Sequence, residues 1–279
     1  MLTANTFHYI FLSEQISFFR NFIWDFYAQH QRPFAWRNVE DPYLVVVSEI
    51  MLQQTQTYRV EPKFDAFIAA FPDFQSLADA SQRDVLSAWQ GLGYNRRGMF
   101  LHKIAQKVVA EFGGTLPNDP EILVTFPGIG KATAASICAF AFNRPTIFIE
   151  TNIRTVFIHS FFKDRDGVHD KELMPLIEQS LDHENPREWY YALMDYGVHL
   201  KKMLPNPSRK SRHHTKQSKF EGSDRQIRGM IIRLLTDHGT LTKKKLLSSI
   251  DRDAHRIEKI ALQLVAEGLI STGGNNFFI

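Results

Sequence analysis

The sequence predicts an all-α protein, and three features of the chain lead to this prediction. Apolar residues recur at helical spacing through most of its length, as in residues 13–30, where Ile16, Phe19 and Ile23 fall on one stripe. The long alternating or β-branched runs of a large sheet are missing, and only residues 146–149 and the end of the chain have strand character. Gly, Pro, Asp or Asn residues interrupt the apolar segments, so the pattern favours many short helices.

The same periodicity places the individual helices. In the first part of the chain we expect helices over residues 13–30, 41–55, 62–72, 81–92 and 98–113. Further helices are expected over residues 120–126, 131–142, 151–162, 172–181 and 186–204. The expected domains are residues 1–204, a linker over 205–221 and a second domain over 222–279.

Composition and charge narrow the class of protein. A chain of 279 residues and 32.3 kDa with 44% hydrophobic residues is long and apolar enough to bury a full core. The formal charge is only +3, but the pI of about 8.9 favours polyanionic partners. The single cysteine, Cys138, excludes an internal disulfide and any multi-cysteine metal or iron–sulfur site within one chain. No metal site is expected.

No targeting signal is recognised. The apolar run "HYIFL" at residues 8–12 is too short for the core of a signal peptide, and no small-residue cleavage site follows it. No segment approaches a membrane span. We therefore expect a cytoplasmic monomer without a membrane partner, associated with the nucleoid when it is bound to DNA.

Residues 205–221 differ from the segments around them. They show no apolar periodicity and carry Arg209, Lys210 and Arg212, which is typical of a linker. Two interpretations remain open, a solvated tether and a basic strap along a phosphate backbone. His213 and His214 have no spaced partner, so this pair does not indicate a metal site.

Residues 222–279 contain three short amphipathic helical segments and a terminal hairpin around Gly273–Asn276. Three helices followed by a hairpin are the pattern of a winged helix-turn-helix domain. Such domains bind DNA or serve as protein contacts, and of these two interpretations we favour nucleic-acid binding.

The stretch "TFPGIGKATAASICAFAF", residues 125–142, predicts two helices joined by a very tight turn. Gly128 and Gly130 allow the backbone to approach a ligand closely, and a helix that begins at Lys131 presents amide groups that suit an anion. Lys131 adds a positive charge and Thr133 lies in the same first turn. A plain corner between two helices is the alternative interpretation.

"FPGIGKATA" resembles the helix-hairpin-helix of DNA base-excision glycosylases, which holds one DNA phosphate on its backbone amides. The motif also occurs in ligases, nucleases and helicases, but the rest of the chain narrows the choice. The segments "PFAWRN", "SEIMLQQTQ", "LSAWQGLGYNRRGMF" and "ALMDYG" follow the order seen in MutY-type adenine DNA glycosylases. The resemblance spans residues 13–204 and implies two helical lobes with the substrate cleft between them, the hairpin lying within residues 120–142.

The resemblance also implies two catalytic carboxylates. Glu49 matches the glutamate that protonates the departing base and then assists water. An acid on an apolar helix is typical of a group that faces a cleft, where partial burial raises its pKa, although an exposed surface carboxylate is the alternative. Glu150 stands where the family has an aspartate that stabilises the sugar cation. A helix-capping role is the alternative for Glu150, and Asn152 follows at a position near the DNA.

Further departures from the family pattern bear on the reaction and on cofactors. The lysine that attacks the sugar in related bifunctional enzymes is replaced by Ala132, one position after Lys131, so we expect a monofunctional enzyme. The family's iron–sulfur loop is replaced by "VHLKKMLPNPSRKS", residues 198–211, which lacks cysteines. We expect no cofactor; a structural monovalent cation at the hairpin stays an open alternative.

The residues expected to recognise the substrate also differ from the family pattern. Tyr191 replaces a glutamine that helps to hold adenine, and the winged helix replaces the domain that recognises 8-oxoguanine. Gln53 and Gln54 are retained and are expected to enter the duplex near the flipped nucleotide. The expected function is a base-excision DNA glycosylase acting on double-stranded DNA, with altered specificity for a damaged, mismatched or modified base, including a hypermodified base of phage DNA in a defence role. The alternatives are an ordinary adenine glycosylase of A/G mismatches and a non-catalytic DNA-binding module.

Overall fold

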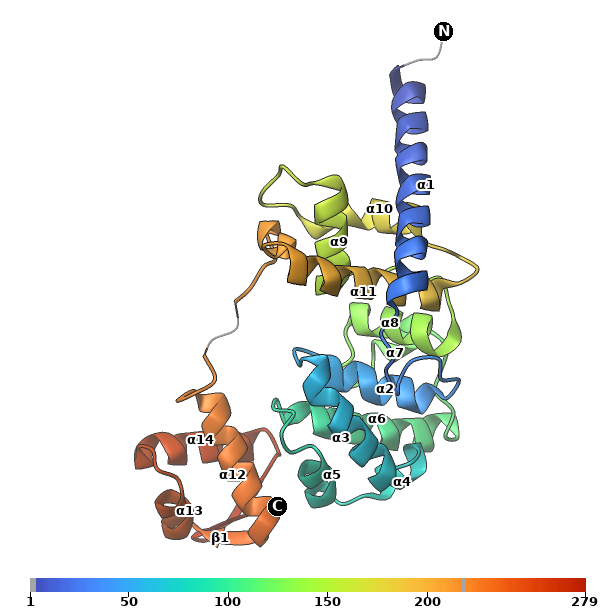
Figure 1. Ribbon diagram of the computed structural model, residues 1–279. Helices are drawn as coiled ribbons and strands as arrows, with labels where there is room; N and C mark the ends of the chain where they lie inside the picture. The colour runs from blue at the N-terminus through green and yellow to red at the C-terminus, as the bar shows by residue number, and fades with distance from the viewer. Residues whose placement is uncertain (1–3, 217–218) are drawn as a thin grey trace. The chain divides into compact units, whose positions relative to one another are not determined.

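The computed structural model describes residues 4–216 and 219–279, with side chains from residue 13 onward. The expected helical architecture is confirmed (Figure 1). The described chain divides into two compact units, each made of several chain segments. None of the described helices is both long enough and apolar enough to cross a membrane.

Unit 1 consists of Met1–Glu40, Asn118–Val124 and Ile129–Lys216. Its elements are α1 (Ala4–His30), α7 (Pro120–Leu123), α8 (Lys131–Phe142), α9 (Thr151–Phe161), α10 (Asp170–Ser180), α11 (Pro186–Met203) and the 3-10 helix η1 (Pro207–Lys210). Helices α9 and α11 pack closely because α11 carries Gly197, where a Cβ atom would lie only 2.5 Å from the carbonyl oxygen of Asn152. This close packing brings the first turn of α9 against α11.

Unit 2 consists of Asp41–Pro117, Thr125–Gly128 and Gln217–Ile279. Its first helices are α2 (Pro42–Leu52), α3 (Thr57–Ala70), α4 (Phe74–Asp79), α5 (Gln82–Ala88) and α6 (Arg96–Phe112). The C-terminal part follows with α12 (Asp224–His238), β1 (Thr240–Thr242), α13 (Lys243–Ser249), α14 (Ala254–Ala266), β2 (Ser271–Gly273) and β3 (Asn276–Phe278).

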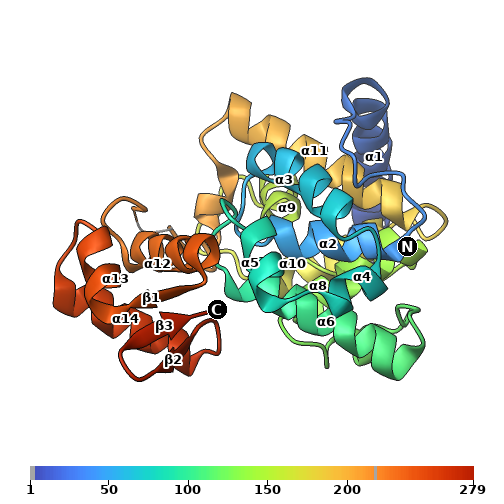
Figure 2. The same ribbon diagram turned by 90° about the horizontal axis from the view of Figure 1, so that it is seen from below.

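The C-terminal part of unit 2 has the elements of a winged helix (Figure 2). The predicted terminal hairpin is present as β2 and β3, which pair antiparallel with Thr272 opposite Phe277. A third strand, β1, pairs antiparallel with β3, so the strand order is β1-β3-β2. Three residues are too few to show a period of two, and the sequence pattern therefore missed β1.

The C-terminal part is docked on α5. Arg83 donates from Nε to the carbonyl of Thr236 at 2.8 Å, and Gln90 donates to the Thr236 hydroxyl at 2.5 Å. Gln82 donates to the carbonyls of Gly268 and Leu269 at 3.2 and 3.0 Å. Unit 2 therefore joins the lobe that carries Glu49 and the winged helix.

Several sequence predictions are corrected. Residues 146–149 form no strand among the described residues: Phe148 packs between Phe140 and Tyr190, and Tyr190 donates to the carbonyl of Thr146 at 2.8 Å. Helix α3 begins at Thr57 and continues through Pro62, where we expected the helix to start. Helix α4 was not expected, although Asp73 caps it by accepting from the amide of Ser76 at 2.7 Å.

Part of the predicted linker is folded. Within residues 205–221, of which 217 and 218 lie outside the described residues, η1 is capped by Asn206 and buries Ser208. The amide of Val168 donates to the carbonyl of Lys210 at 3.0 Å, and the amide of Arg212 donates to the carbonyl of Val168 at 2.9 Å. Residues 205–212 are thus fixed on unit 1 rather than forming a free tether.

Candidate active site

Glu49 lies near the end of α2, the most apolar segment of unit 2. Asp41 caps this helix by accepting from the amide of Tyr43 at 2.9 Å, and Pro42 occupies its first position. Val47, Ile50 and Met51 are fully buried, whereas Glu49 is half-buried. The structure therefore fixes the backbone of this acid in the core of unit 2 while part of its side chain stays accessible.

The turn after α2 holds the two glutamines that were predicted to enter the duplex. Gln54 is exposed and has a φ of +55°, which a residue other than glycine adopts only at a cost in energy. Gln53 donates to the carbonyl of Gly128 at 3.3 Å, so this turn contacts the hairpin loop within unit 2.

A buried arginine that sequence reasoning missed secures this turn. Arg97 donates to the carbonyls of Ile50, Met51 and Gln53 at 2.9, 2.9 and 2.5 Å, and to those of Leu92 and Gly93 at 3.2 and 3.1 Å. Burial lowers its pKa to about 10, which leaves the guanidinium charged at neutral pH. One cation thus holds the end of the Glu49 helix and a second turn, residues 91–95, in fixed positions.

The two hairpin glycines have different structural roles. Gly128 has a φ of +77°, and a Cβ atom there would lie 2.5 Å from Cδ2 of Phe100. Gly130 has an ordinary φ of −92°, and nothing lies within 4 Å of the position of its missing Cβ. Gly128 is therefore required by the fold, whereas Gly130 leaves open space at the start of α8.

The first turn of α8 has the features that suit an anion. Gly130 occupies the N-cap position and contributes no side-chain cap. Lys131 is exposed, Thr133 is half-buried, and no acidic residue stands in this turn. The positive end of the helix dipole and the lysine charge lie together here.

Glu150 caps α9. Its Oε1 accepts from the amides of Asn152 and Ile153 at 2.6 and 2.9 Å, and its Oε2 accepts from Nδ2 of Asn152 at 3.3 Å. The helix-capping role weighed from the sequence is thus present, and the same bonds fix the direction of the carboxylate. Oδ1 of Asn152 is buried and has no hydrogen-bond partner among the described residues.

The charge of Glu150 is subject to opposing influences. Burial raises its pKa, while the bonds from the Ile153 and Asn152 amides and the nearby charge of Lys201 lower it, so that the net shift is upward. Burial lowers the pKa of Lys201, and the charge of Glu150 works against that shift. Lys201 of α11 is therefore an electrostatic partner of Glu150.

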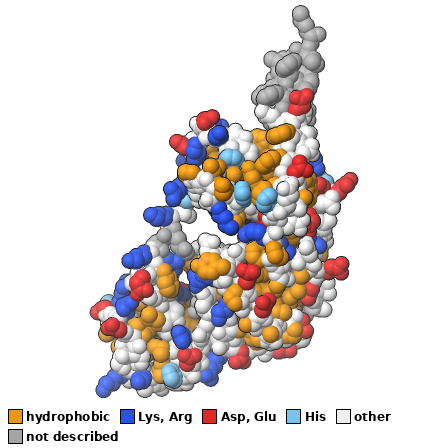
Figure 3. Space-filling view, viewed as in Figure 1, with side chains coloured by type: hydrophobic (Ala, Val, Ile, Leu, Met, Phe, Trp, Pro, Cys, Tyr) orange, Lys and Arg blue, Asp and Glu red, His pale blue; other side chains and the backbone are white. Residues whose placement is uncertain are grey.

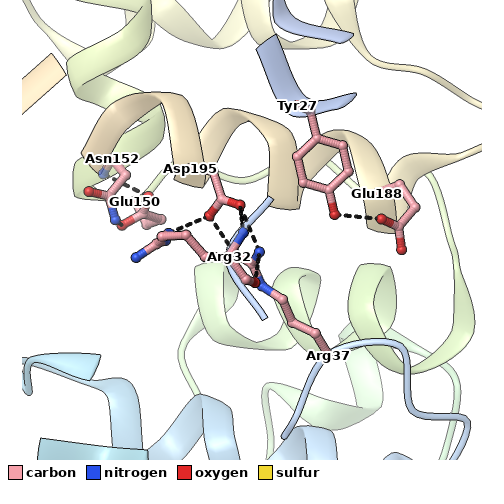
Figure 4. Close-up of polar contacts among 7 residues, drawn as sticks. All are labelled: Tyr27, Arg32, Arg37, Glu150, Asn152, Glu188 and Asp195. Atoms are coloured by element: carbon pink, nitrogen blue, oxygen red, sulfur yellow. Dashed lines mark hydrogen bonds and ion pairs between the residues drawn. The ribbon is translucent and has the colours of Figure 1, made fainter. Parts of the chain in front are cut away.

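A second charged cluster lies beside Glu150 in unit 1 (Figure 4). The buried carboxylate of Asp195 accepts from Nε of Arg32 at 2.7 Å and from both terminal nitrogens of Arg37 at 2.8 and 2.7 Å. It also accepts from the Arg32 amide at 2.9 Å. Figure 4 shows the Arg32 side chain lying between Asp195 and Glu150. These contacts tie residues 32–37 to α11.

Comparison with known proteins gives the family. The sequence profile of the "HhH-GPD superfamily base excision DNA repair protein" matches residues 47–182, which include Glu49, the hairpin and Glu150. The chain belongs to the HhH-GPD superfamily.

Similar relatives include proteins named adenine DNA glycosylase. The one from Buchnera aphidicola subsp. Baizongia pistaciae is 33% identical over 60% of this chain and 48% of its own length. The Mycolicibacterium smegmatis protein is 28% identical over 90% of this chain and 92% of its own length, and the Homo sapiens protein is 34% identical over 66% and 36%. The chain thus spans about half or less of two of these relatives and nearly all of the third.

Solved structures show the same fold. A thermostable thymine-DNA glycosylase matches with a TM-score of 0.60 and 24% identity over 66% of this chain and 87% of its own. A trapped covalent intermediate of Endonuclease III with DNA matches with a TM-score of 0.51 and 15% identity over 75% of this chain and 90% of its own.

Tyr191, predicted to stand in the place of a family glutamine, lies in the core of unit 1. It is 5% exposed, stacks in parallel on Phe140 at 4.7 Å between ring centres, and lies beneath the Arg37 guanidinium at 4.5 Å. Its ring thereby supports Arg37, which binds Asp195. The substrate-binding role predicted for Tyr191 stays a prediction.

The residues present do not fit the iron–sulfur cluster of the superfamily's MutY-type members. The segment after α11 has no cysteine, and Cys138 is fully buried in α8, where burial raises the pKa of its thiol to about 11. The described residues also contain no group of three or more His, Cys, Asp or Glu side chains that could hold a metal.

The basic residues of this segment lie at the end of α11. Figure 3 shows Lys and Arg side chains gathered around the end of α11 and the chain that leaves it. Arg209 and Arg212 are exposed, whereas Lys210 is half-buried and donates to the carbonyl of Lys163. His213 packs edge-on against His169 with ring centres 4.5 Å apart.

Proposed function

We propose that this protein is a monofunctional DNA glycosylase that flips a base out of duplex DNA and hydrolyses its N-glycosidic bond. The observation that carries the proposal is Glu49, a half-buried acid in a helix turn whose other residues are buried, within the segment that matches the superfamily. Partial burial of an acid in an apolar helix is unfavourable for stability. An acid that is kept in such a position is typical of a catalytic group.

The proposed reaction uses Glu49 as acid and then as base. The protonated carboxyl of Glu49 gives its proton to the departing base while the bond between that base and C1′ of the sugar breaks. Water then attacks C1′ and loses a proton to the Glu49 carboxylate. The products are the free base and an abasic site, and Glu49 ends protonated as it began.

Glu150 is proposed to stabilise the positive sugar in this reaction. Its carboxylate is fixed by two backbone amides, so little reorganisation is needed when the cation forms. Glutamate is one methylene longer than the family's aspartate, and a catalytic group misplaced by about 1 Å can lose on the order of a hundredfold in rate. The capping bonds support this role because they hold the longer side chain against its own helix.

The DNA contacts follow from the hairpin and from the surface charge. The solved structures with the same fold include Endonuclease III bound to DNA. We propose that the start of α8, with Gly130, Lys131 and Thr133, binds a DNA phosphate. Arg209, Lys210 and Arg212 are proposed to contact the backbone as well, and Gln53 and Gln54 to contact bases next to the flipped nucleotide.

Two observations bear on the substrate and point in different directions. The relatives named adenine DNA glycosylase favour adenine as the released base. Tyr191 and the winged helix favour an altered preference, because the residues expected to hold adenine and its opposite base are replaced. These relatives and the superfamily concern base excision repair and lend no support to a role in phage defence.

The test of catalysis is Glu49→Gln. The amide keeps the shape of the side chain but cannot give up a proton, so we expect base release to fall by at least about a hundredfold. Affinity for duplex DNA should stay within twofold. The measurement is single-turnover release on duplexes with one candidate base each, followed by alkali to cut abasic sites.

Glu61→Gln is the control, because Glu61 is an exposed acid on α3 of the same unit. The mechanism is wrong if Glu49→Gln retains full activity. The duplex panel includes adenine opposite 8-oxoguanine, adenine opposite guanine and thymine opposite guanine. Rapid, exclusive release of adenine opposite 8-oxoguanine contradicts the altered preference.

A further inference from the structure

The turn formed by residues 91–95 is strained and exposed. Tyr94 has a φ of +46°, and 37% of its surface is accessible. The carbonyls of Leu92 and Gly93 in this turn bind the Arg97 guanidinium, which also binds the carbonyl of Gln53. The turn is therefore fixed to the Gln53–Gln54 turn that is proposed to contact DNA bases.

The winged helix places an arginine on this turn. Arg225 of the first turn of α12 donates from a terminal nitrogen to the Tyr94 hydroxyl at 3.1 Å, and its guanidinium carbon lies 5.6 Å from the centre of the Tyr94 ring. The same guanidinium lies 6.0 Å from the ring of Phe220. The two rings and the hydroxyl thus orient a half-buried cation next to Tyr94.

The docking of the winged helix explains why Arg225 is there. Arg83 and Gln90 hold the opposite end of α12 at Thr236. Because α12 is a rigid helix of 15 residues, these bonds determine where its first turn and Arg225 lie. The position of Arg225 is thus a consequence of the docked interface.

Arg225 and a second arginine lie at the Tyr94 turn. The winged-helix carboxylates of Asp224, Glu221 and Glu267 are paired with Arg256, Arg252 and Arg228 at 2.6, 3.0 and 2.5 Å. Arg59, exposed on α3, donates to the carbonyl of Gly91 in the Tyr94 turn. Two guanidinium groups therefore flank this turn, which favours a polyanion.

The exposed face of α14 is a weaker candidate for DNA contact. A winged helix commonly places its third helix, here α14, in the major groove. That face carries His255, Lys259 and Leu262, of which Leu262 is 50% exposed, and Glu258 lies beside them. Lys259 is the one Lys or Arg among these four residues, and Glu258 is paired with Lys243 at 2.5 Å.

We propose that Arg225, held in place by Tyr94, binds a DNA backbone phosphate, so that the winged helix engages duplex DNA through the start of α12 and not through α14. The proposal rests on the proposed function, because it takes duplex DNA as the ligand. Arg225 then adds a phosphate contact to the surface made by the Gln53–Gln54 turn. Tyr94 is a positioning residue for this contact.

The experiment compares DNA affinity across salt concentrations for Arg225→Ala and Arg233→Ala, on a duplex without any lesion. Arg233 is the matched control, an exposed arginine on the same helix. We expect Arg225→Ala to weaken binding by about fivefold to tenfold and to reduce the salt slope by about one, alike for all duplexes. Arg233→Ala should change affinity by less than twofold. Thermal unfolding of each variant establishes that it is folded.

Two further variants test the role of Tyr94 and the choice of helix. Tyr94→Phe keeps the ring but removes the hydroxyl, so it should weaken binding in the wild type and have no effect in the Arg225→Ala background. The double variant His255→Ala, Lys259→Ala should bind normally. Equal affinities for Arg225→Ala and Arg233→Ala, or a loss confined to the α14 variant, overturn the proposal.

These outcomes are independent of base release. A wild-type protein that binds duplex DNA but releases no base contradicts the proposed function and leaves the comparison of Arg225 with Arg233 intact. A wild-type protein that releases bases while Arg225→Ala binds as well as the control contradicts only the present inference.

Discussion

Glu150 is a buried carboxylate whose surroundings both oppose and favour its charge. Burial disfavours its ionised form, whereas two backbone amides and Lys201 favour it. Lys202, the next residue, is exposed on another face of α11. The pair Lys201 and Lys202 therefore allows the charge next to Glu150 to be tested apart from the basic surface.

Lys201→Met should make the reaction more sensitive to acid. Removing the lysine charge raises the already raised pKa of Glu150 further. The effect of burial is then opposed by the two backbone amides and by Arg154, without the contribution of Lys201. Since the ionised carboxylate is the proposed active form, the acidic limb of the rate profile should move to higher pH. We expect a several-fold loss of rate under mildly acidic conditions that disappears at alkaline pH.

The measurement is the single-turnover rate of base release as a function of pH, with Lys202→Met as the control. A uniform loss of rate at every pH indicates a different role for Lys201. Two other cations act on this pair. Arg154 also lowers the pKa of Glu150, but its guanidinium is partly neutralised because it donates to Asp170 at 2.7 and 2.8 Å. The charge of Arg32 lowers the pKa of Lys201.

Residues proposed to act on ligands could be named from the sequence, whereas the residues that position them could not. Glu49 and Glu150 are acids next to apolar segments, and the family resemblance points to both positions, with glutamate in place of aspartate at the second. Asp195 and Arg97 lie in quoted motifs, but their roles depend on partners about 160 and 45 residues away. A single sequence does not show which distant backbone carbonyls converge on one guanidinium.

At the scale of the element, the two glycines of the hairpin allow its contribution to stability and its proposed phosphate binding to be tested separately. Gly128→Ala forces a side chain into the left-handed region and against Phe100, so we expect a loss of about 1–3 kcal/mol in the free energy of unfolding. Gly130→Ala meets no atom within 4 Å and should leave stability nearly unchanged. Combined with Lys131→Ala, it should weaken DNA binding and flatten the salt dependence.

Urea unfolding and DNA titrations at several salt concentrations measure both effects. A Gly130→Ala variant as unstable as Gly128→Ala contradicts the open space seen at the start of α8. Sequence-dependent loss of binding in the Gly130→Ala, Lys131→Ala variant contradicts a phosphate contact, because a phosphate carries no base information.

Element prediction succeeded where apolar periodicity is sustained and failed in short or extended segments. Helices α6 and α11 show clear stripes, and both were expected close to their observed bounds. Residues 146–149 are apolar because Phe148 fills a hydrophobic site, and this composition imitates a strand. Helix α4 has only six residues, fewer than two turns, so its period could not be recognised.

At the scale of the whole chain, sequence order and spatial grouping differ. The helix-hairpin-helix domain expected over residues 1–204 contributes to both units, and the winged helix belongs to the unit that carries Glu49. The change in composition after residue 204 predicted a separate C-terminal segment, but residues 205–212 are held on unit 1 and the first helix of the winged helix, α12, begins at Asp224. The sequence could not indicate that Gln82 and Arg83 of α5, and Gln90 just after it, would bind the winged helix, because polar residues there are typical of any solvated surface.

The docked interface leads to the last prediction, which concerns Arg83→Ala. Arg83 donates to the carbonyls of Thr236 and Asp237, so its charge lies at the C-terminal end of α12, where a cation stabilises the helix dipole. Removing it should weaken docking by about 1 kcal/mol and leave the carbonyl of the buried Thr236 without this donor.

Hydrogen–deuterium exchange in the Arg83→Ala variant should therefore rise in α12 and α5 and stay unchanged in α9 and α11 of unit 1. Arg233→Ala, which removes an exposed arginine from the same helix, should change none of these. Because docking positions Arg225, Arg83→Ala should also lower DNA affinity. This loss should be indirect, since the Arg83 guanidinium already donates to two carbonyls. Unchanged exchange in α12 contradicts the docking, whereas faster exchange with unchanged affinity contradicts the link between docking and Arg225.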